Sequence, residues 1–226
     1  MSERSPGSWG PSPRSVSRGE SESTSRSEPS PIRDLLVIFL VVYVLQWITA
    51  LFGLGVMTGL FVLSPPIDAR PWTVVTSVYA HGGFGHLLSN SVALVLFGWP
   101  IARATTRLRF HAYFLATGAV AGVSQIVVTG LLAMVPFLSI APTPGVLGAS
   151  GAVFALLGYL LASNRLSDSF ASVIDVPWWV SIGVFLVLAT IVTLATARPR
   201  VALVAHFTGF FAGLIAGRAG VLESDR

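Results

Sequence analysis

The stretch AHFTGFFAGLIAG, residues 205–217, has a small residue at every fourth position: Ala205, Gly209, Gly213 and Gly217. Residues four apart share one face of a helix, and small residues on such a face let two helix backbones approach closely. The stretch GASGAVFALLG, residues 148–158, has a matching small face: Gly151, Ala155 and Gly158. The two stretches are therefore predicted to form helices that pack backbone to backbone.

The whole chain is apolar and poor in charge. Of its 226 residues 53% are hydrophobic and 11% are charged, with a mean hydropathy of +0.76, whereas soluble domains carry roughly 25% charged residues. Backbone groups in a bilayer need internal hydrogen bonds, and the period-two alternation of a barrel is missing, so the apolar stretches are predicted to be helices. There are six of them: about 35–63, 86–102, 112–134, 148–163, 178–196 and 201–217.

We therefore expect an all-α membrane protein, a bundle of six transmembrane helices. The first stretch is long enough to tilt, and the last is near the lower limit of about 17 residues for a spanning helix. Residues 1–32 are rich in Ser, Pro, Gly, Arg and Glu, which predicts a disordered tail. The apolar run after it is too long for the apolar region of a cleaved signal peptide. The chain thus divides into this tail, a membrane domain at 33–218 and a short tail at 219–226.

The arginines predict the orientation. All 14 basic residues are arginine, and eleven of them fall on the side of the N-terminus, against three on the other side. The positive-inside rule then places both termini in the cytoplasm, and the beginnings of the second, fourth and sixth stretches face outward. The arginines form no basic stripe, so no nucleic-acid partner is expected. Arginine without lysine hints at a GC-rich prokaryotic genome, and hence at a prokaryotic cell membrane.

Ser150 is the first polar candidate for a functional site. A serine in a membrane helix often bonds only to its own backbone or assists packing. Here Gly148 and Gly151 flank it where a loop becomes a helix, and the start of a helix offers free N–H groups and the positive end of the dipole. Such a position suits a nucleophile whose reaction creates an oxyanion.

His206 and His86 are ionisable side chains inside the apolar stretches, where such groups are costly and mark functional candidates. A lone histidine near a membrane surface is often structural. His206, however, lies beside the small-residue face at its outer end, so close packing of the two helices would bring it to Ser150. That is the position a general base needs.

The stretch HGGFGHLLSN, residues 81–90, places His86 and Asn90 four residues apart and thus on one helix face. Asn90 alone is typical of a helix–helix hydrogen bond, but an imidazole and a carboxamide together can donate to a developing oxyanion. His81 precedes the helix and is interpreted as a residue that orders the loop. The chain has no cysteine, and no carboxylate lies near these histidines in the sequence, so neither a metal site nor a cofactor is expected.

Taken together, three motifs resemble the rhomboid family of intramembrane serine proteases: HGGFGHLLSN with its H-x4-H-x3-N spacing, GASGAVFALLG and AHFTGFFAG. They occur in the family's order on the second, fourth and sixth stretches, and the resemblance covers roughly residues 35–217. Two features depart from the family. Thr73 follows Trp72 where the family commonly has arginine, with Arg70 two residues earlier, and the second stretch lacks a glutamate at its inner end.

The resemblance implies a dyad of Ser150 and His206 without an acidic third member. His86, Asn90 and the Ser150 backbone N–H would form the oxyanion hole, and Phe154 would lie against the catalytic imidazole. The implied substrates are single membrane helices, cut near the outer interface, with water reaching the dyad through a polar cavity open to the outside.

The sequence is compatible with three functions: an active protease, a catalytically silent relative that binds transmembrane helices, and a small transporter or proton relay. A silent relative usually lacks the serine or the histidine, and a relay would need acidic residues in mid-membrane, which this chain lacks. The sequence therefore favours the protease, whose partners are transmembrane substrates and the bilayer. It indicates neither the substrate nor the oligomeric state.

Overall fold

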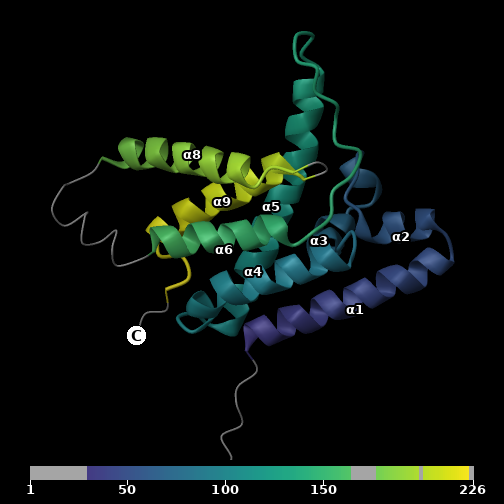
Figure 1. The fold of residues 1–226 in the computed structure, drawn as a ribbon, viewed down its shortest axis with the longest axis horizontal. Coiled ribbons are helices and arrows are strands. Elements are labelled where there is room, and N and C mark those ends of the chain that lie inside the picture. The colour runs from purple at the N-terminus through teal and green to yellow at the C-terminus, as the bar shows by residue number, and fades with distance from the viewer. Residues whose placement is uncertain (1–29, 164–176, 199–200, 224–226) are drawn as a thin grey trace, which may run out of the picture.

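A computed structural model describes residues 30–163, 177–198 and 201–223, and these residues are organised almost entirely as helices (Figure 1). The described elements are α1 (Pro31–Leu51), α2 (Leu54–Phe61), a 3-10 turn (Ile67–Ala69), α3 (Thr73–Tyr79), α4 (Phe84–Ala102), α5 (Arg107–Ala133), α6 (Ser150–Ala162), α8 (Trp178–Ala195) and α9 (Leu203–Arg218). Within these ranges the extended pairing is limited to one bridge between Leu63 and Val146. The predicted all-α class is confirmed for this part of the chain.

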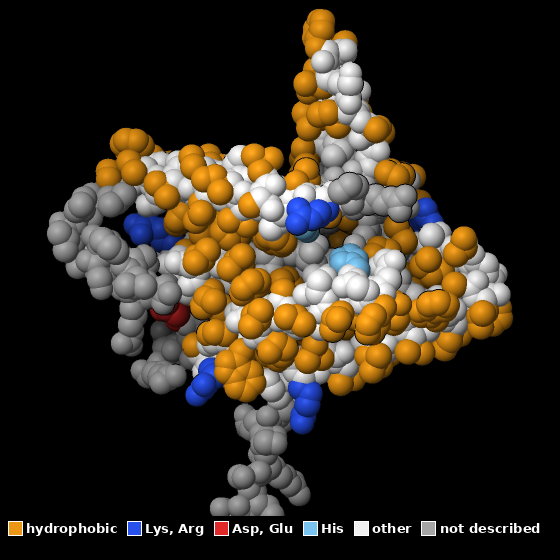
Figure 2. All heavy atoms as spheres, viewed as in Figure 1, with side chains coloured by type: hydrophobic (Ala, Val, Ile, Leu, Met, Phe, Trp, Pro, Cys, Tyr) orange, Lys and Arg blue, Asp and Glu red, His pale blue; other side chains and the backbone are white. Residues whose placement is uncertain are grey.

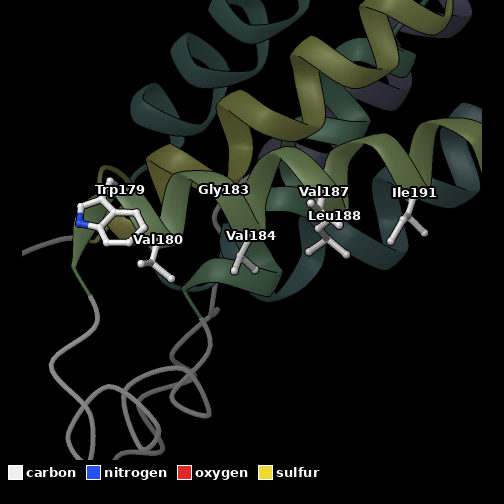
Figure 3. Close-up of a pocket in the computed structure, with 7 residues that line it drawn as sticks. All are labelled: Trp179, Val180, Gly183, Val184, Val187, Leu188 and Ile191. Carbon is white, nitrogen blue, oxygen red and sulfur yellow. The ribbon is translucent and has the colours of Figure 1, made fainter.

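Four of these helices, α1, α4, α5 and α8, are long and apolar enough to cross a membrane, whereas α6 and α9 are shorter apolar helices. In Figure 2 hydrophobic side chains cover most of the visible face and charged side chains are few. One side of α8 is a continuous apolar surface with a shallow groove, to which Trp179, Val184, Val187 and Ile191 contribute (Figure 3). A surface of this kind suits contact with lipid.

The first apolar stretch is not the single helix that the sequence analysis expected over 35–63. The α1 helix begins earlier, with Pro31 in its first turn, where the missing proline N–H costs nothing. It ends at Leu51, and α2 starts after Gly53, whose φ of 121° is a conformation that side chains disfavour. A tilted single span is therefore the wrong description, because a glycine divides the stretch. Residues 1–29, most of the predicted disordered tail, lie outside the described residues.

The α6 and α9 helices pack together as their small residues predict. A Cβ added to Gly209 would collide with the Gly151 backbone, and one added to Gly213 would collide with the Ala155 backbone. At Gly217 it would lie 2.5 Å from the Tyr159 carbonyl oxygen. Each step of four residues along α9 matches four along α6, so the two helices run parallel and their first turns lie side by side. The predicted backbone-to-backbone packing is confirmed.

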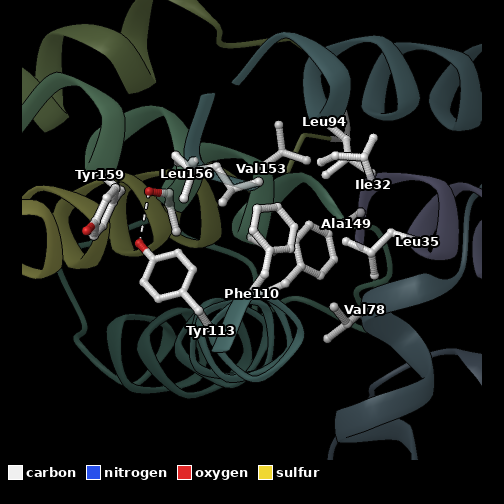
Figure 4. Packing of buried hydrophobic residues seen from close by; sticks show 14 of the residues in the cluster. Ile32, Leu35, Val78, Leu94, Phe110, Tyr113, Ala149, Val153, Leu156 and Tyr159 are labelled. Atoms are coloured by element: carbon white, nitrogen blue, oxygen red, sulfur yellow. Dashed lines mark hydrogen bonds between the residues drawn. The ribbon is translucent and has the colours of Figure 1, made fainter. Parts of the chain in front are cut away.

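The α5 helix joins this pair to the rest of the bundle. Figure 1 shows it crossing the direction of α6, α8 and α9. Phe110 and Phe114 near its start are completely buried, and Tyr113 donates its hydroxyl hydrogen to the Ala155 carbonyl at 3.0 Å (Figure 4). A buried hydroxyl needs such a partner, and this bond places α5 against the middle of α6.

The segment between α2 and α4 contains Arg70 and Trp72, and both side chains hold it in place. Trp72 donates its indole N–H to the Gly59 carbonyl at 3.1 Å, and Arg70 bonds to Ser64 Oγ at 3.0 Å. Both residues thus pin the loop onto α2 and the segment that follows it. In this chain Arg70 supplies a loop contact from a position two residues before Trp72.

The other end of the bundle holds the described ends of the chain together. Asp34 in the first turn of α1 accepts a hydrogen bond from Arg107 Nε at 2.6 Å and lies 3.1 Å from His111 Nε2. Arg109 donates to the Glu223 carbonyl at 2.9 Å. The beginnings of α1 and α5 and the segment after α9 therefore meet at one end, opposite to the beginnings of α6 and α9.

Candidate active site

Ser150 is the first residue of α6, and the first helical hydrogen bond there runs from the Val153 N–H to the Ala149 carbonyl at 2.9 Å. The N–H groups ahead of that bond have no partner inside the helix. Ser150 lines a small cavity to which Ala121 of α5 and Ala205 of α9 also contribute. The serine thus stands beside a space lined by α3, α5, α6 and α9, with backbone donors close by.

His206 lies in the first turn of α9, buried against α6. Its ring stacks on Phe154, with 4.2 Å between ring centroids and 25° between the ring planes. Its Nδ1 has no hydrogen-bond partner among the side chains that the structure describes. Among the described residues there is also no hydrogen bond between Ser150 Oγ and the His206 ring. Hydrogen bonds of catalytic groups are often long or poorly aligned before substrate binds, and here it is the packing of α6 against α9 that makes the two residues neighbours.

His86, in the first turn of α4, faces the backbone that leads into α6. A Cβ added to Gly148 would lie 2.6 Å from His86 Cε1 and 2.9 Å from Nε2. The Gly82 N–H donates to His86 Nδ1 at 3.3 Å. Because a neutral imidazole carries one proton, an accepting Nδ1 leaves that proton on Nε2, the nitrogen that faces Gly148. The His86 Nε2–H group is therefore a donor that faces Gly148, and Gly148 precedes Ser150 by two residues.

Gly148 has a φ of 132°, which side chains disfavour, and its N–H donates to the Ser77 carbonyl at 2.8 Å. The glycine thus serves two needs, an unusual backbone turn and room for the imidazole.

Asn90 is buried one turn after His86 on the same helix. Its side-chain amide donates to the His86 carbonyl at 3.0 Å. One of its two N–H groups is therefore bound to its own helix, and the second is left for another acceptor.

His81 is almost completely buried, with its ring edge-on to Phe39 at 4.9 Å and to His86 at 5.3 Å between centroids. Burial, and secondarily the neighbouring His86, lowers the pKa of His81 to about 4, so the ring is neutral at physiological pH. Its backbone N–H donates to Gln46 Oε1 at 2.9 Å. These contacts agree with a residue that orders the loop.

Two buried glutamines near the site were missed in the sequence analysis. Gln46 of α1 holds the His81 backbone, as just described. Gln125 of α5 accepts the Ala205 N–H at 3.1 Å and donates to Thr143 Oγ1 at 2.8 Å. Gln125 thereby ties the start of α9, next to His206, to the segment before α6. The available signal was a carboxamide in an apolar stretch, where polar side chains usually bond across helices.

The structure therefore brings together the beginnings of α4, α6 and α9, which carry His86, Ser150 and His206. Among the described residues no group of three His, Cys, Asp or Glu side chains is arranged to hold a metal ion. What the arrangement offers is a hydroxyl, a buried imidazole and several N–H donors around one small cavity.

The rhomboid domain profile matches residues 68–222 of the chain. Curated proteins are similar over much of the same region. The chain is 26% identical over 159 residues to the putative rhomboid protease YdcA of Bacillus subtilis, covering 69% of this chain and 70% of that protein. It is 25% identical over 154 residues to the rhomboid protease GlpG of Haemophilus influenzae, covering 66% and 70%. It is also 26% identical to RHOMBOID-like protein 5 of Arabidopsis thaliana over 159 residues, which span 66% of this chain but 44% of the plant protein.

Proposed function

The chain belongs to the rhomboid family of multi-pass membrane proteins, and from this premise we propose that it is an intramembrane serine endopeptidase with Ser150 as nucleophile and His206 as general base. Its substrates would be membrane proteins, cut within a transmembrane helix near the outer interface. Two of the relatives above are named as rhomboid proteases, which supports the activity.

The observation that carries the proposal is the parallel packing of α6 and α9. Gly209 and Gly213 contact the α6 backbone at Gly151 and Ala155. The first of these contacts is between Gly151 and Gly209. Ser150 directly precedes Gly151 on α6, and His206 lies three residues before Gly209 on α9. Two helices in such close parallel contact hold both side chains at the same depth, and a nucleophile and its base have to lie together.

In the proposed reaction Ser150 Oγ attacks the carbonyl carbon of the scissile peptide bond, while the His206 imidazole accepts the hydroxyl proton. The oxyanion that forms accepts hydrogen bonds from the Ser150 N–H, from His86 Nε2 and from the free N–H of Asn90. His206 then gives the proton to the leaving amine, and water releases the acyl group. Phe154, stacked on His206, would hold the imidazole plane in place.

The proposed topology has six spans, both termini in the cytoplasm and the active site open to the outside, in a prokaryotic cell membrane. The described ends of the chain meet at the end that carries Arg107 and Arg109, as the positive-inside rule favours. The 13 residues of α6 rise about 20 Å, less than the roughly 30 Å of the hydrocarbon core. A helix that starts deep in this way would place Ser150 below the outer surface, where a membrane helix can be reached.

The test is cleavage of a model transmembrane substrate by the full chain in liposomes. The wild type is expected to cut, and Ser150→Ala and His206→Ala are expected to be inactive. Matched controls are Ser163→Ala, at the far end of α6, and His111→Gln, at the far end of the bundle; both should cut at the wild-type rate. A chelator should have no effect.

Equal cutting by the wild type and Ser150→Ala would refute the assignment of the nucleophile. If the wild type binds the substrate helix but never cuts it, the chain is instead the silent helix-binding relative.

A further inference from the structure

The α5 helix is longer than a membrane crossing requires. Its 27 residues rise about 40 Å, against a hydrocarbon thickness of roughly 30 Å. Figure 1 shows its C-terminal part projecting away from the other helices, and the chain then returning beside it. We call residues 127–140, the last turns of α5 and the turn that follows, the apolar arm.

The apolar arm exposes large hydrophobic side chains. Leu131 is 60% exposed, Met134 77% and Phe137 94%, and Figure 2 shows hydrophobic side chains at the tip of the projection. Contiguous apolar surface of this kind is unusual on a surface that faces water and marks a site of contact with protein or lipid.

Charge is missing from the whole region around the arm. Between Arg109 and Arg165 the sequence has no Asp, Glu, Lys or Arg. The arm, residues 141–149 that lead back to α6 (the return segment) and α6 itself therefore carry none. Loops in water carry charged and polar residues, and a specific protein interface usually has a polar rim. An arm without any charged side chain is instead compatible with lipid on all of its open sides.

The backbone of the return segment sets the depth at which the arm can lie. Irregular backbone exposed to lipid does not occur within the hydrocarbon region. The return segment is anchored at Thr143, whose N–H donates to Thr129 Oγ1 at 3.1 Å and whose hydroxyl accepts from Gln125. Pro136, Pro142 and Pro144 have no N–H to satisfy. Such a segment fits the boundary between headgroups and acyl chains rather than the bilayer centre.

We propose that the apolar arm inserts into the interface of the bilayer, with Met134 and Phe137 among the acyl-chain carbons nearest the headgroups, so that the arm is a lipid-binding surface of the molecule. Aromatic and long apolar side chains are the residues that anchor segments at this depth. The assignment to the outer leaflet rests on the proposed topology, whereas the immersion of the arm in lipid does not depend on proteolysis.

The chain has no cysteine, so a single introduced cysteine can be labelled without further mutation. A nitroxide would be attached at Phe137→Cys in the full chain in phospholipid liposomes, and its collisions with oxygen and with a water-soluble nickel chelate would be measured. Val187→Cys, on the apolar face of α8, is the lipid control, and Asp68→Cys, in the exposed outer loop, is the water control.

The label at position 137 is expected to show an oxygen-to-nickel collision ratio at least several-fold above that at position 68 and below that at position 187, which lies midway along α8. Nickel access equal to that at position 68 would show an arm in water and overturn the proposal. Low access to both reagents would show an arm covered by protein, such as a second copy of the chain, and would overturn it as well. The same measurement in the Ser150→Ala background should be unchanged, which separates this result from the fate of the protease proposal.

Discussion

At the scale of single residues, Gly148 has the most demanding environment near the site. Its φ is 132°, and the His86 ring occupies the space that a Cβ would need. Any side chain at this position has to displace the imidazole, the backbone, or both. Because His86 presents its Nε2 proton toward this glycine, a shift of the ring would move a proposed oxyanion donor.

We predict that Gly148→Ala lowers kcat on the order of 10²–10³-fold, the usual loss for one oxyanion donor, while the protein still inserts into membranes. Gly82→Ala is the matched control, since its added Cβ would lie 3.8 Å from His86 Nδ1 in ordinary contact. Steady-state cleavage of the model substrate measures both variants. Equal rates for the two alanine variants would show that His86 does not act from this position.

At the scale of the elements, the α6–α9 contact depends on backbone atoms, which cannot move aside as a flexible side chain can. We predict that Gly213→Ala destabilises the protein by about 1–3 kcal/mol, the usual cost of overpacking, because its Cβ would meet the Ala155 backbone. Gly183→Ala on α8 meets nothing within 4 Å and should leave stability unchanged or slightly raised. Thermal unfolding in detergent micelles measures the difference, and an unchanged Gly213→Ala would contradict the close packing.

Gln125 connects three elements, because it bonds to the start of α9 and to the segment before α6. Gln125→Met keeps the side-chain volume but leaves the buried Ala205 N–H without a partner, which costs about 1–3 kcal/mol. We expect lower thermal stability, together with a fall in kcat that exceeds any change in KM, since His206 is next to Ala205. Gln125→Glu retains an acceptor and should recover part of kcat. Loss of stability alone, with kcat intact, would limit Gln125 to a structural role.

At the scale of the whole molecule, the two ends of the bundle differ in kind. One end collects Asp34, Arg107 and Arg109 with the described ends of the chain, and the other collects the polar side chains around Ser150. This polarity predicts the orientation in the membrane. Because α6 and α9 run parallel, their first turns are at the same end, and a single orientation therefore decides which side the site faces.

The orientation can be measured with single cysteines in the cysteine-free chain. In right-side-out vesicles, a membrane-impermeant maleimide should label Asp68→Cys at once and Arg218→Cys only after detergent is added. Both positions are exposed in the structure, so access to the side chain itself is not limiting. The reverse pattern of labelling would invert the topology and place the site on the cytoplasmic side.

The helical class, the small-residue faces and the chain order of the three motifs can be read from the sequence, because they follow from composition and from the period of a helix. The matching spacing of Gly209 and Gly213 with Gly151 and Ala155 was also enough to predict which helices pack together. Each of these features is local or depends on one repeated interval, and so it can be recognised without knowing the path of the chain.

Four features required the three-dimensional structure: the break at Gly53, the contact of His86 with Gly148, the bonds of Gln125 and the projection of α5. These depend on backbone conformation and on contacts between residues far apart in the chain. The residue type alone does not distinguish a glycine needed for an unusual backbone turn from a glycine needed for close helix packing. It also does not show which groups a buried glutamine bonds to. Their roles became visible only once the neighbours that fill, or would collide with, each position were known.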